Sequence, residues 1–165
     1  IFPAPPFFRL TPESTLTSLN RFLIDPAVLS SQLDDDNSTT AVLTTLEAWV
    51  GSNLNHDLEV FLATTGPNVT TYEWYTQDGR IEGRNLHEDW IREQDAPMDI
   101  SWTLEDLLLR HYGRVAVASY TLRVQAVEHG VVVQAHSDET VVLEEHNEAW
   151  RVVHVHKSPH GSDEE

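Results

Sequence analysis

A chain of 165 residues, of which 40% are hydrophobic and 8% aromatic, is long enough for one globular domain with a sizeable core. Its 27 Asp and Glu residues outnumber its 10 Lys and Arg residues and give a net charge of −17, which repels the phosphates of nucleic acids and of anionic membranes. We therefore expect no nucleic acid and no membrane as a partner, and the absence of Cys excludes a disulfide framework and a thiolate nucleophile.

The hydropathy of the chain bears on whether a helix could cross a membrane. No apolar run approaches the roughly 20 residues that a helix needs to span a bilayer. We expect a soluble protein, cytoplasmic in preference to secreted, although Ile1 in place of an initiator Met also fits a processed secreted form.

The first 36 residues are predicted to form an N-terminal arm and a helix, ahead of one compact domain over residues 37–165. The arm begins IFPAPPFF, a composition typical of a segment that docks on a folded surface or of a linker. Thr11 and Pro12 then resemble an N-cap and a first-turn proline, and they predict a helix that ends near Asp25.

Three further helices are predicted from apolar residues at intervals of three and four. The longest covers residues 40–51, where Val42, Leu46 and Trp49 share one face. Such a face must be buried, so this helix needs a sheet to cover. Shorter helices are predicted over residues 56–66 and 84–93.

Most of the remaining chain has the β-branched and aromatic composition of strands. One strand is predicted over residues 69–75, a short one between Gly79 and Gly83, and four long ones over residues 102–112, 114–130, 131–147 and 149–158. Turn residues separate the long strands, which predicts an antiparallel meander. The fold class is therefore α+β: a curved antiparallel sheet, shaped as a cone-like half barrel, is covered by N-terminal helices and leaves a central cavity.

The last predicted strand, AWRVVHVHKSP, carries two histidines two residues apart. Side chains alternate between the two faces of a strand, so Trp150, His154 and His156 are predicted to share one face, opposite Val155 and Lys157. The large indole ring belongs under the helices. We therefore predict that His154 and His156 form walls of a polar pocket on the helix-covered side of the sheet.

A second polar stretch, HSDET, supplies candidate acids and bases. Burial in an apolar cavity raises the pKa of a carboxyl group, which suits a base that removes a proton next to a carbonyl. The candidate catalytic residues are His156, Glu139 and Asp138. A structural alternative is that Glu139 forms a buried ion pair with Arg123.

The pocket is predicted to be polar, with an aromatic floor. Its predicted lining is Tyr72, Trp74, His87, Arg123, His136, Glu139, Trp150, His154 and His156. A metal would need a third ligand beside the two histidines of the last strand, and His136 with Asp138 could supply it, but the ligands lack any set spacing. We expect neither a metal nor a cofactor.

Short motifs in a fixed order carry a family resemblance over roughly residues 56–161. They are Asp57-Leu58-Glu59, Pro67, Val69-Thr70-Thr71-Tyr72-Glu73, Ile81-Glu82-Gly83 with His87, Ser137-Asp138-Glu139-Thr140, and Trp150 with His154-Val155-His156-Lys157-Ser158. In these motifs the chain resembles the association (hub) domain of calcium/calmodulin-dependent protein kinase II, of the nuclear transport factor 2-like superfamily. The SnoaL-like proteins of this superfamily share much of the pattern.

The resemblance implies assembly into rings of subunits and a pocket lined by arginines. Val141 stands where the family has one pocket arginine, and Arg123 is the candidate match for a second. Two functions follow. The first is an oligomeric association and ligand-binding module, a homo-oligomer that takes a small organic ligand. The alternative is a cofactor-free enzyme of the SnoaL or ketosteroid isomerase kind, an isomerase, dehydratase or cyclase working by acid–base chemistry.

Apolar residues on the predicted strands also indicate self-association. One helical layer covers only one face of a sheet, so valines on the opposite face would remain exposed to solvent. The valines predicted to lie on that outer face are Val117, Val131, Val133, Val141 and Val153.

Overall fold

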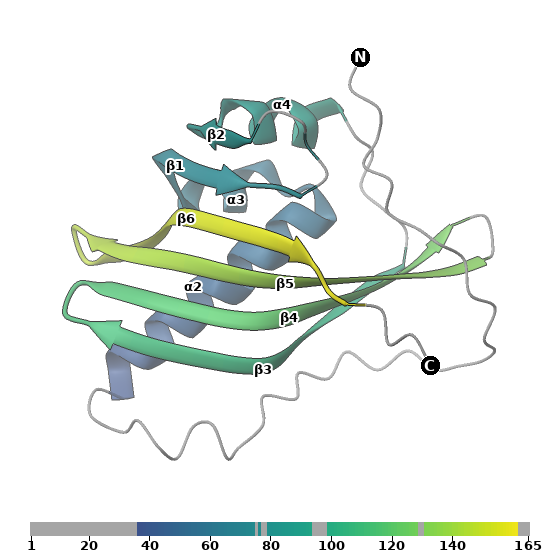
Figure 1. Ribbon diagram of the computed structural model, residues 1–165. Coiled ribbons are helices and arrows are strands. Elements are labelled where there is room, and N and C mark those ends of the chain that lie inside the picture. The colour runs from purple at the N-terminus through teal and green to yellow at the C-terminus, as the bar shows by residue number, and fades with distance from the viewer. Residues whose placement is uncertain (1–35, 75, 77–78, 94–98, 129–130, 162–165) are drawn as a thin grey trace.

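The computed structural model describes residues 36–74, 76, 79–93, 99–128 and 131–161 (Figure 1). Its elements in chain order are α2 (Asp36–Asn55), α3 (Leu58–Thr64), β1 (Thr65–Tyr72), β2 (Arg80–Glu82), α4 (Asn85–Glu93), β3 (Ile100–Tyr112), β4 (Val115–Glu128), β5 (Val131–His146) and β6 (Ala149–Pro159). The predicted N-terminal arm and its helix lie outside the described residues, so the division of the chain at residue 36 stays a prediction. In the described ranges, no helix is long and apolar enough to cross a membrane.

The described strands form a single curved sheet in the order β2-β1-β6-β5-β4-β3. The long strands β3 to β6 pair antiparallel with their neighbours in the chain, which confirms the predicted meander. The strand β1 pairs antiparallel with β2 but parallel with β6. This pairing places the first and last described strands side by side, between β2 and β5, so the sheet is not antiparallel throughout.

The helix α2 lies against one face of the sheet, which we call the inner face; Figure 1 is viewed from the opposite, outer face. The apolar stripe of α2 forms as predicted, because Val42, Leu46 and Trp49 are all buried. They pack with strand residues of the inner face, such as Leu143 and Val155, into one core. The predicted α+β class, a curved sheet with N-terminal helices, is confirmed; the central cavity stays a prediction.

A β-bulge in β6 reverses the alternation of its side chains. Val142 pairs with His154 while the next residue of β5, Leu143, pairs with Val152, so Val153 is an extra residue without a partner in the ladder. After the bulge, the residues that face the helices are odd-numbered. Gly66 of β1 lies beside the bulge, where an added Cβ would stand 3.3 Å from the carbonyl oxygen of Val152.

The bulge makes one prediction wrong. Trp150 is buried on the inner face, but His154 and His156 lie on the outer face, opposite Val142 and Thr140. The alternation that placed both histidines beside the indole ring holds only for an uninterrupted strand, and one extra residue moves every later side chain to the other face. Lys157 and Val155, predicted to point outward, point inward instead.

The predicted set of outward-facing valines is also partly wrong. Val133 and Val141 are 3% and 0% exposed and belong to the inner face. Val117 does lie on the outer face, since it pairs with Arg110 and Val142 on either side. The outer face nevertheless carries a group of apolar side chains near the turn between β3 and β4, which we call the apolar patch. Its residues are Leu108, Tyr112, Val115, Val117 and Val142.

Candidate functional site

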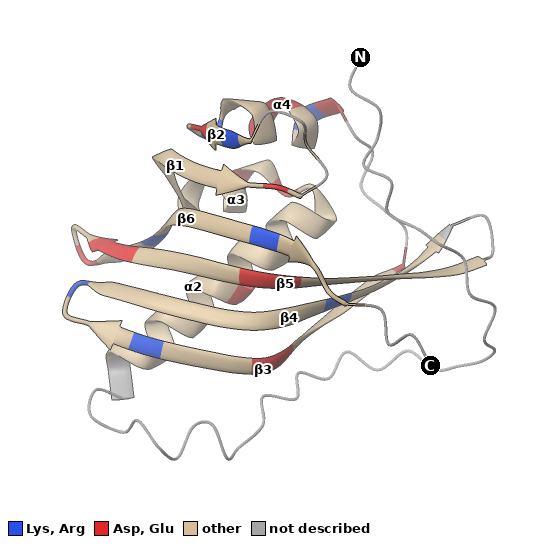
Figure 2. Cartoon of the chain, viewed as in Figure 1, with Lys and Arg blue, Asp and Glu red and all other residues tan. Residues whose placement is uncertain are grey.

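Charged and polar side chains from five segments meet in the interior, between the inner face and the helices. We call them the buried polar cluster: Glu73 directly after β1, His87 on α4, Tyr120 on β4, Glu139 on β5 and Lys157 on β6. The antiparallel register places Lys157 opposite Glu139. Figure 2 shows the basic segment of β6 beside an acidic segment of β5.

Lys157 is the cation of this cluster. Its Nζ lies 3.2 Å from Oε1 of Glu73, and His87 Nε2 lies 3.3 Å from the same oxygen. The ammonium group also lies 5.9 Å from the centroid of the Trp49 ring, within the range of a cation–π contact. Because Glu73 is 5% exposed, its charge is tolerated only through such partners.

Glu139 is the second buried carboxyl group of the cluster and accepts two hydrogen bonds. The Tyr120 hydroxyl donates to Oε2 and the Ser137 hydroxyl donates to Oε1, each at 2.9 Å. Both carboxylate oxygens of Glu139 thus accept a hydrogen bond, one from a side chain of β4 and one from a side chain of β5. The cluster thus holds two carboxyl groups and a phenol that are buried, together with an ammonium group and an imidazole whose side chains are 17% and 15% exposed.

Burial and neighbouring charges shift the pKa values of the two carboxyl groups in opposite directions. Burial raises the pKa of Glu73, but the nearby Lys157 and the hydrogen bond with His87 outweigh it, and the net pKa is lowered from 4.5. Burial also raises the pKa of Glu139, and there the opposing effects of Lys157 and Tyr120 are insufficient, so the net pKa is raised. Glu73 therefore remains ionised at a lower pH than Glu139 does.

Two polar atoms of the cluster lack a hydrogen-bond partner. Oε2 of Glu73 and Nδ1 of His87 are both fully shielded from solvent. Buried polar atoms of native proteins are nearly always satisfied, often by an internal water molecule. These two atoms are therefore where a water molecule or a small polar ligand would bind within the cluster.

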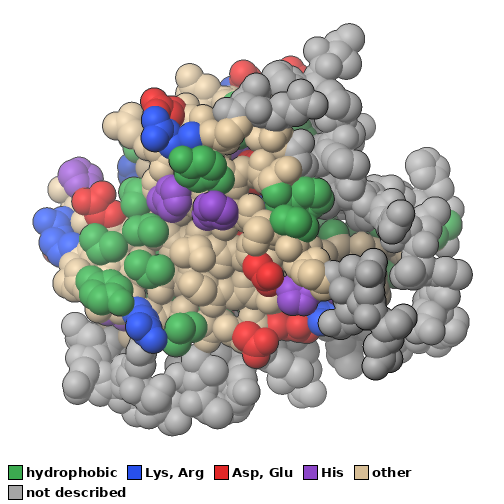
Figure 3. Space-filling model, in the orientation of Figure 1, with side chains coloured by type: hydrophobic (Ala, Val, Ile, Leu, Met, Phe, Trp, Pro, Cys, Tyr) green, Lys and Arg blue, Asp and Glu red, His purple; other side chains and the backbone are tan. Residues whose placement is uncertain are grey.

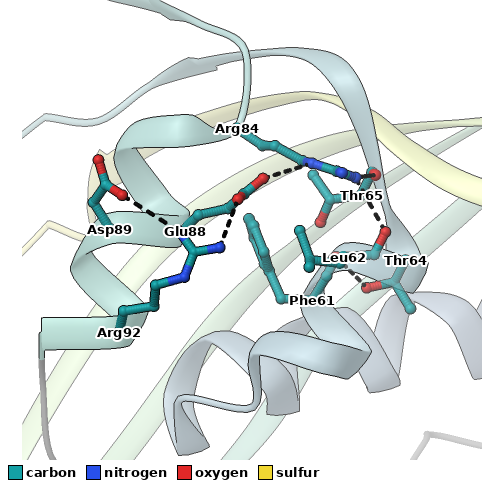
Figure 4. A network of polar contacts seen from close by, with 8 residues as sticks. All are labelled: Phe61, Leu62, Thr64, Thr65, Arg84, Glu88, Asp89 and Arg92. Carbon is teal, nitrogen blue, oxygen red and sulfur yellow. Dashed lines mark hydrogen bonds and ion pairs between the residues drawn. The ribbon is translucent and has the colours of Figure 1, made fainter.

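A network around Arg84 fixes the helix that carries His87 (Figure 4). The Arg84 guanidinium donates to Oε1 of Glu88 at 2.7 Å and to the carbonyl oxygens of Leu62 and Thr65 at 3.2 and 3.1 Å. One side chain thus joins the start of α4 to the end of α3. Arg92, one turn further on, also contacts Glu88.

A groove of about 370 Å³ lies on the opposite, outer face of the sheet. We call it the outer groove. Ten residues line the outer groove. Eight of them belong to the outer face: Asp106, Leu108, Ser119, Thr121, Asp138, Thr140, His156 and Ser158. The other two are Tyr120 and Glu139. In the outer groove Thr121 donates to Oδ1 of Asp138 at 2.8 Å, and His160 Nδ1 lies 2.8 Å from the same oxygen. The hydrogen bonds from His160 and Thr121 lower the pKa of Asp138.

Histidine side chains lie beside hydrophobic ones over β1 and β6 (Figure 3). The aromatic neighbour of these histidines is Tyr72. The Tyr72 ring stacks on His156 at a centroid distance of 5.3 Å and meets the edge of His154 at 6.2 Å. Thr70 Oγ1 lies 2.7 Å from Nδ1 of His154. Burial and then the neighbouring His156 lower the pKa of His154, so its neutral form is favoured.

The structure divides the predicted pocket between the two faces. Glu139, His87 and Trp150 lie on the helix-covered side. Tyr72, Arg123, His136, His154 and His156 lie on the outer face, as does the candidate catalytic residue Asp138, and Trp74 is 41% exposed after the end of β1.

The predicted ion pair between Glu139 and Arg123 is wrong. Arg123 points to the outer face, where its guanidinium contacts Glu105 and lies 3.1 Å from Nε2 of His136. It thus shares no face with Glu139, because the two occupy positions of opposite orientation on β4 and β5.

Sequence reasoning missed three members of the buried polar cluster: Glu73, Tyr120 and Lys157. One local signal existed for Glu73, which stands between Tyr72 and Trp74 in a strand-like stretch and must alternate with them. No local signal existed for Lys157, whose direction depends on the bulge in β6.

A sequence model described as "Calcium/calmodulin dependent protein kinase II association domain" matches residues 38–161. No curated protein sequence matches the chain. Solved structures share its fold. The hub of the kinase from S. rosetta is 22% identical, with a TM-score of 0.65 over 73% of this chain and 95% of that one.

Two further solved structures cover similar shares. The association domain of the kinase from C. elegans is 18% identical, with a TM-score of 0.70 over 77% of this chain and 99% of that one. A protein from Streptomyces avermitilis, named as a candidate dehydratase of the NTF2-like family, is 16% identical, with a TM-score of 0.63 over 76% of this chain and 97% of that one. At sequence identities this low, the structural similarity shows that the fold is shared and shows nothing about function.

Proposed function

This chain belongs to the calcium/calmodulin-dependent protein kinase II association domain family, and from that membership we propose that it is an association module that assembles with further copies of itself. The observation that carries the proposal is the match of the family model to residues 38–161, nearly all of the described domain. Self-association needs a surface, and the outer face of the sheet offers one.

The apolar patch on that face supports the proposal. Leu108 and Tyr112 are 43% and 61% exposed, and among the described residues no helix covers them. Exposed apolar groups on neighbouring strands mark interaction sites more often than single ones do. A second copy is the occupant that fits, because Arg110 and Arg151 lie on the same face as Glu144, and a two-fold axis would bring opposite charges of two copies together.

Light scattering at micromolar concentration tests the proposal. We expect a mass of at least two copies of the 18.7 kDa chain. Leu108→Glu places a charge in the apolar patch and is expected to lower the assembly mass, by dissociating copies at the concentration that keeps the unaltered chain assembled.

Leu86→Glu is the matched control, because Leu86 is 38% exposed but lies on α4 and not on the sheet. It is expected to leave the mass unchanged. A monomeric unaltered chain would contradict the association function, and equal losses of mass in both variants would contradict the choice of surface.

A second function has one specific observation in its favour. Glu139 is a buried carboxyl group with a raised pKa, hydrogen-bonded to the Tyr120 phenol. Such a pair can transfer a proton to and from carbon next to a carbonyl, the chemistry of a cofactor-free isomerase or dehydratase. We rank it second, because both oxygens of Glu139 already accept hydrogen bonds within the domain.

Turnover of a β,γ-unsaturated ketone tests the second function. If Glu139 is the base, Glu139→Gln is expected to lower kcat at least a hundredfold, in the range usual for general-base catalysis. Circular dichroism would establish that the variant remains folded. The absence of turnover by the unaltered chain, or equal turnover by the variant, contradicts the enzymatic role.

A further inference from the structure

The apolar patch continues across the outer face of the sheet to a histidine. Val117 pairs with Val142, Val142 pairs with His154, and His154 pairs with Thr70 on its other side. Side chains that are paired in such a row stand about 5 Å apart. Figure 3 shows histidine side chains beside hydrophobic ones on this face. Stable interfaces cover about 800 Å² of each copy, so a second copy seated on the apolar patch also covers the imidazole next to Val142.

The surroundings of His154 favour its neutral form. Its imidazole is half-buried, Thr70 Oγ1 lies 2.7 Å from its Nδ1, and the Tyr72 ring meets it edge-on at a centroid distance of 6.2 Å. The titratable group beside it on β6 is a second imidazole, that of His156. Burial and then this neighbour lower the pKa of His154.

The carboxylates farther along the outer face have cations of their own. On β5, Glu144 stands opposite Arg151 in the ladder with β6. On β2, Glu82 forms an ion pair with Arg80. Within the described ranges, His154 contacts neither of these carboxylates. A proton on His154 would therefore add a charge that no carboxylate of the same chain compensates.

From this geometry we propose that protonation of His154 opposes self-association, so that mild acid switches the assembly off. The inference rests on the proposed association function. An imidazolium covered by a second copy would lose its water without a carboxylate from its own chain, and burying an unpaired charge is costly. Histidine is the side chain whose charge changes between neutral pH and mild acid, and its protonation is a known trigger of changes at interfaces.

The net charge of the chain predicts the opposite direction. Lowering the pH adds protons and reduces the net charge of −17, which weakens the repulsion between copies and favours association. Weaker association in mild acid therefore indicates a specific group that loses its proton on assembly. In an assembly of two copies, two imidazoles would each lose one proton, so the dissociation constant would rise by at most about a hundredfold for each pH unit.

Dilution series followed by light scattering, at about pH 7.5 and at about pH 5.5, test the proposal. We expect the dissociation constant of the unaltered chain to be about tenfold or more higher at the lower pH. His154→Asn is expected to remove this rise, because the amide takes up no proton and keeps a polar atom for Thr70. Circular dichroism at both pH values separates dissociation from unfolding.

His56→Asn is the matched control. His56 is also half-buried, but it lies between α2 and α3 and not on the sheet, and Asn suits its φ of 56°. This variant is expected to show the full rise. Equal or tighter association of the unaltered chain in mild acid, a rise that persists in His154→Asn, or a rise that is lost in His56→Asn would overturn the inference and leave the association function standing. A chain that is monomeric at both pH values would overturn both.

Discussion

Replacing Lys157 with Met is expected to lower the free energy of unfolding by about 3–5 kcal/mol, the range measured when one partner of a buried ion pair is removed. Met preserves the length and the apolar part of the side chain, so the lost charge dominates the effect. Glu73, whose side chain is 2% exposed, would keep its negative charge without the ammonium group 3.2 Å away. Denaturant unfolding at one fixed protein concentration measures the change.

Two further variants separate a buried charge from a general loss of charge. Arg80→Met removes a cation whose side chain is 54% exposed and is expected to leave the free energy of unfolding nearly unchanged, because water screens an exposed ion pair. Adding Glu73→Gln to Lys157→Met is expected to recover part of the lost stability, because the uncompensated charge is then gone. Equal losses for Arg80→Met and Lys157→Met would contradict the role assigned to Lys157.

The second large effect distinguishes the two faces of β6. Val155→Asn is expected to lower the free energy of unfolding by about 3 kcal/mol or more, because it buries an amide in the core where Val155 is fully enclosed. His156→Asn, one residue later, is expected to change it by less than about 1 kcal/mol, since His156 is exposed on the outer face. Thermal unfolding of both variants measures the difference.

A strand without the bulge predicts the reverse order. His156 would then share the inner face with Trp150, and Val155 would point to solvent. A greater loss for His156→Asn than for Val155→Asn would therefore contradict the bulge at Val153, and with it the inward direction of Lys157.

Local patterns in the sequence were sufficient for the elements and the fold class. Apolar residues at helical spacing lie on α2 as predicted, with Val42 and Leu46 both fully buried. Composition and turn residues separated the four strands of the meander correctly to within a few residues. These features follow from interactions between near neighbours in the chain, so a sequence pattern contains them.

The motifs quoted for the family resemblance were likewise sufficient to identify the association-domain family, which the match over residues 38–161 confirms. The self-association, the ligand of the buried polar cluster and the catalytic role of Glu139 remain predictions, because family membership and fold do not determine chemistry at a site.

Which residues come together at the site was decided by the tertiary structure alone. The parallel pairing of β1 with β6 brings Glu73 and Lys157 together from positions 84 residues apart, and no local spacing contains that contact. The bulge at Val153 then decides which side chains of β6 face the helices. Its position is a property of the packing between strands, where Gly66 of β1 and the ladder with β5 accommodate one unpaired residue. Because side chains alternate with a period of two, that single residue decides that Lys157 enters the core and that His154 and His156 face outward.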